Sequence, residues 1–369
     1  MNALVTGGAG LIGSHIVDLL IDKGYDVKIL DSLEKPTHMF GPPSWINKKA
    51  HFIEGDIRDE TVLDNALKDV DIVFHQAAAG GFMPEINYYV DVNCTGTALM
   101  MEKIIKKHKI KKLIIASSQA VYGEGKYNSD SHGEIFPELR TISQLSKGDW
   151  EVKCPLSGAN LKPLGTDENS KIQGDTVYAV SKYCQEKLVL GIGKKYDIPT
   201  VALRYSMTYG PRQSISNPYT GVMSIFSTQI LNDKPPVIFE DGNQIRDMVF
   251  VEDVAKANLF VAENDEIVND YFNVGTGKKT KIIDLANMLI SAYKKNFRPN
   301  ISGEFRPGEV RHLFADCSKL EKYGFKSETL LKDGILSYLN WINEQDNVKE
   351  YFSNAIDQLK KLRVVVSTK

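Results

Sequence analysis

The sequence predicts an α/β fold in which helices cover both faces of a doubly wound, mostly parallel sheet. Short apolar runs alternate with amphipathic segments through the first half of the chain. The first run, Asn2–Thr6, leads directly into a glycine-rich turn, and an amphipathic segment follows that turn. Such alternation is typical of right-handed β–α–β units, whose strands lie parallel in one sheet. At 369 residues, the chain is long enough for this sheet and a smaller second lobe.

The individual elements of the sheet domain follow from apolar periodicity and from the turn residues between them. Short, mostly apolar runs predict strands at Asn2–Thr6, Asp26–Asp31, His51–Glu54, Asp71–His75, Lys112–Ser117 and Thr200–Tyr205. Segments with an apolar stripe at helical spacing predict helices at Leu11–Lys23, Thr61–Leu67, Val92–Lys107 and Val177–Lys195. The two kinds of element alternate, as a doubly wound sheet requires.

Breaks in this alternation define the expected domain organisation. We expect a sheet domain over residues 1–205, with a polar, turn-rich insertion at about 124–175 and a return segment at about 236–273. Residues 206–235 and 274–345 are expected to form a smaller C-terminal α/β lobe that holds the substrate. Residues 346–369 are expected to form a charged amphipathic helix and a tail.

Composition excludes several classes of function. The formal net charge of -2 gives no reason to expect a nucleic-acid or membrane partner. The N-terminus does not resemble a secretory signal, and no apolar run is long enough to span a bilayer. The four cysteines (Cys94, Cys154, Cys184 and Cys317) are scattered, and the seven histidines show no metal-binding spacing. We therefore expect a cytoplasmic protein without a bound metal.

The turn after the first strand carries the pattern of a dinucleotide site. Gly7, Gly10 and Gly13 fit the Gly-x-x-Gly-x-x-Gly spacing, and Leu11 and Ile12 begin the following helix. Glycines permit a tight turn and a close approach of the backbone to a pyrophosphate, while the helix N-terminus directs free N–H groups at it. This context, between a strand and an amphipathic helix, predicts a Rossmann-type domain.

An acidic residue at the end of the second strand favours NAD over NADP. Asp31 follows Gly13 by 18 residues, where a carboxylate can accept hydrogen bonds from the adenosine ribose and repel a 2′-phosphate. Asp56, after the third strand, is placed to meet the adenine. Small side chains at Ala77, Ala78 and Ala79, after the fourth strand, would let the cofactor lie against the backbone.

Tyr178 and Lys182 form the predicted catalytic pair. Residues four apart on a helix share one face, and an ammonium group near a phenol lowers the pKa of the phenol. The phenolate can then act as a general base on a sugar hydroxyl. Ser118, at the end of a strand, can hydrogen-bond the same hydroxyl and help to transfer its proton.

With these motifs in this order over residues 1–340, the chain resembles an extended short-chain dehydrogenase/reductase of the NAD-dependent epimerase/dehydratase family. The resemblance implies tightly bound NAD and a nucleotide-diphosphate sugar as substrate. It also implies a homodimer, built as a four-helix bundle from the helices near Val92–Lys107 and Val177–Lys195. Further cofactor contacts are implied for Ser32, Ile57, Asn93, Ser117 and Tyr205, in addition to Tyr178 and Lys182.

The same resemblance implies a substrate site in the C-terminal half. Arg246 and Arg306 lie in segments that resemble the family's diphosphate contacts, and an arginine fork suits a diphosphate by charge and shape. The other expected substrate contacts are Phe82, Ser118, Gln119, Tyr178, Met207, Arg212, Asn217 and Glu309. Met207 stands where the family commonly has an asparagine, so the identity of the sugar stays open.

The residues after Ser118 indicate which reaction to expect. Family dehydratases have an Asp-Glu pair there, whereas Gln119 and Ala120 cannot protonate a leaving hydroxyl or remove the C5 proton. We therefore expect a 4-epimerase, similar to those acting on dTDP-L-rhamnose or UDP-glucose. A 4-keto-sugar reductase or related oxidoreductase is the alternative, and a non-catalytic nucleotide sensor is a remote one. Ser157 replaces the second cysteine of a Cys-Pro-x-Cys-Gly pattern in the insertion, which argues against a zinc site.

Overall fold

A seven-stranded parallel sheet forms the centre of the molecule. The computed structural model describes residues 1–81, 85–219, 221–346 and 348–368. The strands follow the order β14-β9-β5-β4-β1-β2-β3, and every neighbouring pair is parallel. Their bounds are Asn2–Thr6 (β1), Asp26–Asp31 (β2), His51–Glu54 (β3), Ile72–His75 (β4), Lys112–Ser118 (β5), Thr200–Tyr205 (β9) and Asp270–Val274 (β14). The predicted doubly wound sheet is confirmed.

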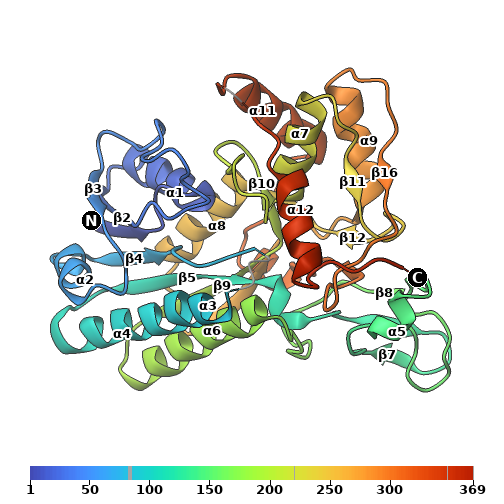
Figure 1. Cartoon of the computed structure of the whole chain (residues 1–369). Coiled ribbons are helices and arrows are strands. Elements are labelled where there is room, and N and C mark those ends of the chain that lie inside the picture. Colours follow the sequence, from blue (N-terminus) through green and yellow to red (C-terminus); the bar gives the residue numbers. More distant parts are fainter. Residues whose placement is uncertain (82–84, 220, 347, 369) are drawn as a thin grey trace.

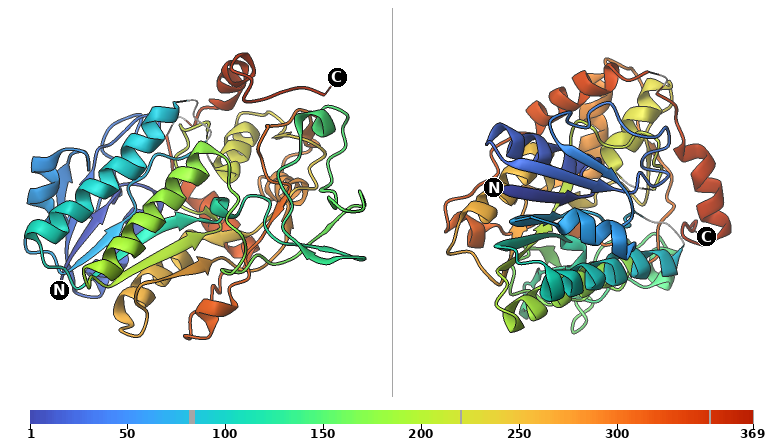
Figure 2. Two further views of the ribbon diagram at one scale, coloured as in Figure 1. Left: turned by 90° about the horizontal axis from the view of Figure 1, so that it is seen from below. Right: turned by 90° about the vertical axis from the view of Figure 1, so that its left-hand side faces the viewer.

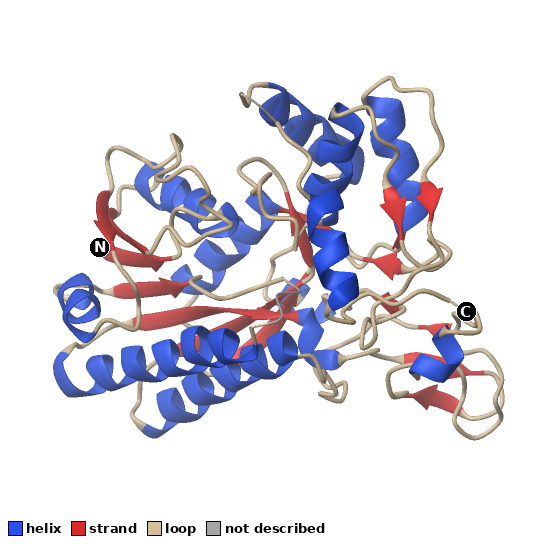
Figure 3. Ribbon diagram, in the orientation of Figure 1, coloured by secondary structure: helices blue, strands red, loops and turns tan. Residues whose placement is uncertain are grey.

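Helices cover both faces of this sheet, so the central strands are apolar on both sides (Figures 1 and 3). One core contains Ala3 and Val5 together with α1 (Leu11–Asp22) and α8 (Val251–Glu263). The other core contains Leu4, which lies between them in sequence, because successive side chains of a strand point to opposite faces. This second face is covered by the helices α2 (Glu60–Leu67), α4 (Gly96–Lys107) and α6 (Val177–Lys195).

The helix predicted at Val92–Lys107 begins six residues earlier, at Ile86. Three consecutive parts make it up, namely α3 (Ile86–Tyr89), the π-helical segment η1 (Val90–Thr95) and α4. The β-branched and aromatic residues of the first turn have low intrinsic helix propensity, but tertiary contacts override it. Tyr89 is buried, and its ring lies edge-on to that of Tyr178 with centroids 6.3 Å apart.

A smaller lobe packs against the carboxyl ends of the strands (Figures 1 and 2). Its core lies among α7 (Val222–Leu231), α9 (Ile282–Ala292) and α11 (Leu331–Asn343). Short strands pair within it: β10 (Met207–Tyr209), β11 (Val237–Ile238), β12 (Ile245–Arg246), β13 (Met248–Phe250), β15 (Thr280–Lys281), β16 (Asn300–Ile301) and β17 (His312–Leu313). The chain finally forms α10 (Ser318–Glu321) on the sheet side and α12 (Phe352–Lys361) near the C-terminus.

The return to the sheet domain starts later than the predicted residue 236. Strands β11 and β12 pair with β16 and β17 and so belong to the smaller lobe. Only α8 and β14 rejoin the sheet domain, because α8 packs on α1 and β14 pairs with β9. These elements are too short and irregular for apolar periodicity to assign them to a lobe.

The insertion forms a compact unit of its own at the edge of the substrate lobe (Figure 1). It contains β6 (Tyr127–Ser129), β7 (Gly133–Ile135), α5 (Ile142–Leu145) and β8 (Lys162–Pro163), and its strands are antiparallel. A small core consists of Tyr127, Val152, Cys154 and Leu161. Within the described ranges, no helix is long and apolar enough to cross a bilayer, and no group of three or more His, Cys, Asp or Glu could hold a metal ion.

Candidate active site

The turn between β1 and α1 has no room for side chains. Gly7 has a φ of 68°, in the left-handed region, and a Cβ atom there would lie 2.7 Å from the main-chain nitrogen of Ala77. A Cβ atom on Gly13 would lie 2.2 Å from the Gly7 carbonyl oxygen. No side chain caps α1, so its first N–H groups are available to an anion. The backbone itself forms a phosphate cradle.

A groove runs from this turn along the ends of β2, β3 and β4. It is lined by eight of the predicted cofactor residues, namely Gly7, Gly10, Asp31, Ser32, Asp56, Ile57, Ala77 and Ala78. Glu34, Thr37, His38 and Tyr88 also line it and were not predicted. The only signal for the first three was their position in the polar loop after β2, where many side chains would fit equally well.

Asp31 is fixed before any ligand arrives. One carboxylate oxygen accepts a hydrogen bond from the Ala9 N–H and the other from the Leu33 N–H, both at 2.9 Å. The ring of His38 lies 3.8 Å away and is buried, and this burial lowers the pKa of His38. Asp31 therefore stabilises the glycine turn as well as presenting a negative charge to the groove.

Ser118, Tyr178 and Lys182 come together at the carboxyl end of β5. Thr176 caps α6 by accepting a hydrogen bond from the Ala179 N–H, which places Tyr178 in the first turn. The Ser118 hydroxyl lies beside the phenol and favours its ionised form, but burial raises the pKa of Tyr178 overall. The predicted depression of this pKa by Lys182 is therefore wrong.

Lys182 is also buried and has an acceptor of its own. Its side chain is buried, which lowers its pKa to about 7, and its Nζ donates to Gln185 Oε1 at 2.8 Å. The ammonium group is thus held by an amide one turn further along α6. Helical spacing predicts that Tyr178 and Lys182 share a face, but it does not predict that Gln185 accepts the hydrogen bond of the lysine.

Three predicted cofactor residues have their polar groups occupied within the protein. The Asn93 amide, in η1, accepts from the Ala79 N–H and donates to the Ala79 oxygen and to Ser181 Oγ. Ser117 donates to Glu186 at 2.7 Å. The Tyr205 hydroxyl contacts Gln76 and Asn258. These residues brace the groove, and their predicted direct contact with a cofactor has no geometric support.

Near Tyr178, the loop that contains Gly80 and Gly81 meets a second segment, residues 217–219. Gly80 lies against the Tyr178 ring, and a Cβ atom on Gly81 would lie 2.9 Å from the Tyr219 carbonyl oxygen. Asn217 caps this second segment by accepting from the Tyr219 N–H, and Met207 is half-buried in β10. Phe82 lies outside the described residues.

Gln119 presents an unused acceptor. Its side-chain oxygen is shielded from solvent and accepts no hydrogen bond from the described part of the chain. It follows Ser118 directly, at the start of the 3₁₀ turn η2 (Gln119–Tyr122). A buried, unsatisfied oxygen next to Ser118 fits a hydroxyl donor from a ligand.

Arg246, Arg306 and Glu309 form a cluster on the substrate-lobe side. The Glu309 carboxylate lies 3.2 Å from Arg246 Nη2 and 3.7 Å from Arg306 Nη1. Arg246 also donates to the main-chain oxygens of Ile245, Val310 and Arg311. Burial, followed by the neighbouring Arg246, lowers the pKa of Arg306, and Glu309 opposes this. Two guanidinium groups therefore face one carboxylate in this cluster.

Arg212 does not join this cluster. Its backbone is left-handed, with a φ of 69°, and its Nη1 lies 2.7 Å from Asp18 on α1. The arginine thereby links the start of the smaller lobe to the first helix of the sheet domain. Because the side chain pairs with Asp18, its predicted contact with the substrate is not supported. The left-handed conformation of Arg212 could not be foreseen from the sequence.

Comparison with known proteins now adds to this geometry. The model of the family described as "NAD dependent epimerase/dehydratase family" matches residues 3–142 and 157–275. The chain belongs to this family. Its cofactor is therefore NAD, as expected, and the phosphate cradle and the acidic end of β2 fit that group.

Individual members of the family match over nearly the whole chain. A putative UDP-glucose 4-epimerase of Methanocaldococcus jannaschii is 38% identical over 93% of this chain and 99% of its own. A dTDP-L-rhamnose 4-epimerase of Burkholderia thailandensis is 31% identical, covering 93% and 95%. The crystal structure of a UDP-glucuronic acid 4-epimerase of Bacillus cereus, in complex with UDP-glucuronic acid and NAD, matches with a TM-score of 0.77 and 28% identity, covering 93% and 99%.

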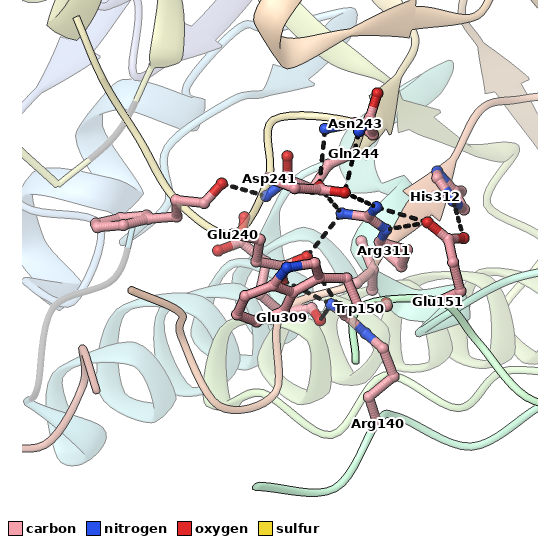
Figure 4. Close-up of polar contacts among 12 residues, drawn as sticks. Arg140, Trp150, Glu151, Glu240, Asp241, Asn243, Gln244, Glu309, Arg311 and His312 are labelled. Carbon is pink, nitrogen blue, oxygen red and sulfur yellow. Dashed lines mark hydrogen bonds and ion pairs between the residues drawn. The ribbon is translucent and has the colours of Figure 1, made fainter. Parts of the chain in front are cut away.

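A buried network of charged side chains connects the insertion to the segment that carries Glu309 (Figure 4). Arg311 is fully buried, and its guanidinium contacts Glu151, Glu240 and Asp241. Arg140, from the insertion, binds both oxygens of Glu240 at 2.9 Å. The network thus ties the insertion to the same segment that carries Glu309. Sequence analysis assigned no role to these residues.

Proposed function

We propose that this chain is a nucleotide-sugar 4-epimerase that inverts C4 of an NDP-hexose through a 4-keto intermediate. The observation that carries the proposal is that the Ser118 hydroxyl lies beside the Tyr178 phenol, with Lys182 one turn further along α6. The names of the relatives and of the structural neighbour support the same reaction class. The intact catalytic set argues against a non-catalytic sensor, which would need only the groove.

The residues of the chain then have separable tasks. Tyr178 removes the proton of the C4 hydroxyl, and Ser118 holds that hydroxyl and passes the proton on. NAD held along the groove at Gly7, Asp31 and Ala77 would supply reversible hydride transfer at C4 and a positive charge that favours the ionised form of the phenol. Lys182 adds a positive charge on the same side of the phenol. After the keto sugar has turned over, Tyr178 gives its proton back to the oxygen on C4.

Turning the keto sugar requires an anchor that is remote from C4. Arg246, Arg306 and Glu309 supply it in our proposal, because the diphosphate is the only part of the substrate that carries negative charge in every NDP-hexose. A guanidinium binds two phosphate oxygens at once, which restrains the nucleotide while the sugar rotates. Gln119 would accept a hydrogen bond from a sugar hydroxyl next to C4.

A dehydratase is disfavoured by the same geometry. Gln119 and Ala120 follow Ser118 in the turn η2, and neither side chain can act as an acid or a base. A 4-keto-sugar reductase remains the alternative, because it uses the same three catalytic groups. The two differ in cofactor balance, since an epimerase consumes no external NADH.

We further propose a homodimer through α6 and the helix formed by α3, η1 and α4. Three apolar side chains on these helices are exposed, namely Ile86 (64%), Val90 (46%) and Val180 (56%). A four-helix bundle between two copies would cover them. Val180→Glu should convert the dimer to a monomer in light scattering, whereas Leu336→Glu, at an equally exposed position on α11, should not.

The direct test of the reaction is an NMR assay of C4 configuration. Purified enzyme is incubated with UDP-, dTDP-, GDP- and CDP-hexoses, and absorbance at 340 nm is followed in parallel. An epimerase produces the C4 epimer of at least one sugar without net formation or consumption of NADH. Stoichiometric change in NADH would show a reductase instead, and loss of water from C6 would show a dehydratase.

A further inference from the structure

Lys182 is held by a side chain that the proposed mechanism does not use. The lysine is 2% exposed, and its Nζ donates to Gln185 Oε1 at 2.8 Å. Gln185 is itself 1% exposed and lies on the same helix, α6. A buried ammonium group needs an acceptor because water is excluded from it.

Gln185 is in turn fixed by the sheet domain. Its Nε2 donates to Thr97 Oγ1 at 2.8 Å and lies 3.3 Å from His75 Nε2. Thr97 donates to the Asn93 carbonyl oxygen at 2.6 Å, and its Oγ1 lies 2.9 Å from His75 Nε2. His75 Nδ1 reaches Thr6 Oγ1 at 2.7 Å. A buried chain of polar groups therefore leads from the end of β1 to the lysine.

The amide orientation follows from this chain. Burial and the charge of Lys182 lower the pKa of His75 to about 3, so the ring is neutral. With either tautomer of the ring, the Thr97 hydroxyl gives its proton to the Asn93 carbonyl oxygen and can only accept from Gln185. The Gln185 nitrogen must then face Thr97, and only its oxygen can face Lys182. The glutamine cannot flip without losing contacts at both ends.

We propose that Gln185 is a positioning residue that keeps Lys182 charged and aimed at the catalytic site. The proposal rests on the function proposed above in one respect, namely that Lys182 assists Tyr178. A neutral acceptor bound to the ammonium favours its charged form, whereas burial favours the neutral form. Because burial lowers the pKa of Lys182 to about 7, the charge of this lysine near neutral pH depends on the acceptor.

The other ionisable groups around Lys182 do not replace this acceptor. His75 faces it from β4 and is neutral. Cys94 faces it from η1, and burial raises the pKa of this thiol to about 12. Cys184, which lies beside Cys94, and Tyr178 complete the set on α6. Within the described part of the chain, the Gln185 amide oxygen is the group that accepts a hydrogen bond from the Lys182 ammonium.

The test compares Lys182 in NAD-loaded wild-type enzyme and variants by NMR with ¹⁵N-labelled lysine. Lys182→Arg assigns the resonance. Gln185→Leu should weaken proton binding to Lys182 about tenfold, and Gln185→Glu should strengthen it by at least as much. Gln229→Leu, which removes a buried amide on α7, is the control and should leave the titration unchanged. If Gln185→Leu does not fold, Gln185→Met replaces it.

Kinetics give a second, separate readout. In Gln185→Leu, kcat should match that of wild type well below about pH 6 and fall to about a tenth of it above about pH 7, because the lysine of the variant loses its proton at lower pH, while KM changes less than about twofold. An unchanged lysine titration in both Gln185 variants would overturn the proposal, as would a loss of activity that is uniform across pH. The NMR result does not depend on epimerase activity, so its failure is distinguishable from a failure of the proposed function.

Discussion

Arg140 Nη2 donates a hydrogen bond to the main-chain oxygen of Glu309 at 2.9 Å, across 169 residues of sequence. The arginine belongs to the insertion, and the glutamate carboxylate bridges the two arginines of the proposed diphosphate anchor. Because the guanidinium is also fixed by both oxygens of Glu240, it holds this segment at a defined distance from the insertion. The insertion thus positions the segment that carries the proposed diphosphate anchor.

Arg140→Lys should therefore weaken substrate binding more than it slows the reaction. Lysine keeps the charge but loses the fork, and a charge-assisted hydrogen bond contributes about 1.5–3 kcal/mol. We expect KM for the nucleotide sugar to rise roughly tenfold or more, with a smaller change in kcat, in steady-state assays. Lys162→Met, which breaks an exposed ion pair with Asp130 on the same insertion, is the control and should behave as wild type. Equal KM values for the two variants would contradict the supporting role.

Tyr178→Phe should abolish turnover while NAD stays bound. The phenol hydroxyl is the proposed base, and the ring itself packs against Tyr89 and Gly80, which phenylalanine preserves. Turnover is followed by NMR, and retained cofactor by its absorbance after denaturation of the protein. Ser118→Ala should retain more activity than Tyr178→Phe, because Ser118 assists the proton transfer whereas Tyr178 is the final acceptor of the proton. Full activity in Tyr178→Phe would remove the base from the mechanism.

Removal of Arg306 or of Arg246 should weaken substrate binding. Arg306→Met is expected to raise KM by about ten- to a hundredfold, the equivalent of about 1.5–3 kcal/mol. Arg246→Met should raise KM and also lower Tm, because this guanidinium binds three main-chain oxygens as well. Calorimetry and steady-state kinetics separate the two effects. A lower Tm at unchanged KM in both variants would show a purely structural cluster.

The Glu151–His312 contact should make stability depend on pH. Hydrogen bonding from His312, and then from Arg311, lowers the pKa of Glu151 to about 2. A carboxylate with a depressed pKa stabilises the fold above its unfolded value of about 4.3 and loses that contribution as pH falls toward 2. The gap in Tm between wild type and Glu151→Gln should therefore be largest near neutral pH and close below about pH 4. A constant gap across this range would exclude the linkage, and Asp130→Asn provides the exposed control.

The sheet and its glycine turn were predictable because apolar periodicity and backbone sterics act locally. Strands at Asn2–Thr6 and Asp26–Asp31 and the cradle at Gly7 and Gly13 follow from neighbouring residues alone. The partners of charged side chains did not follow. Arg246 pairs with Glu309, and Lys182 binds Gln185, because the tertiary fold brings these groups together. Helix spacing alone could not show which of several nearby acceptors a cation would choose.

The sequence position of β14 has a consequence for how the chain is made. Among the described residues, this edge strand, Asp270–Val274, pairs with β9 alone, and β9 (Thr200–Tyr205) is buried along its whole length. During synthesis, β9 leaves the ribosome before β14, and the edge of β9 that will pair with β14 stays unpaired while most of residues 206–269 are added. Until then it is an apolar strand with an open hydrogen-bonding edge, which is the form most prone to pairing with another chain. A fragment ending near residue 205 should therefore aggregate, and the nascent enzyme should depend on chaperones in that interval.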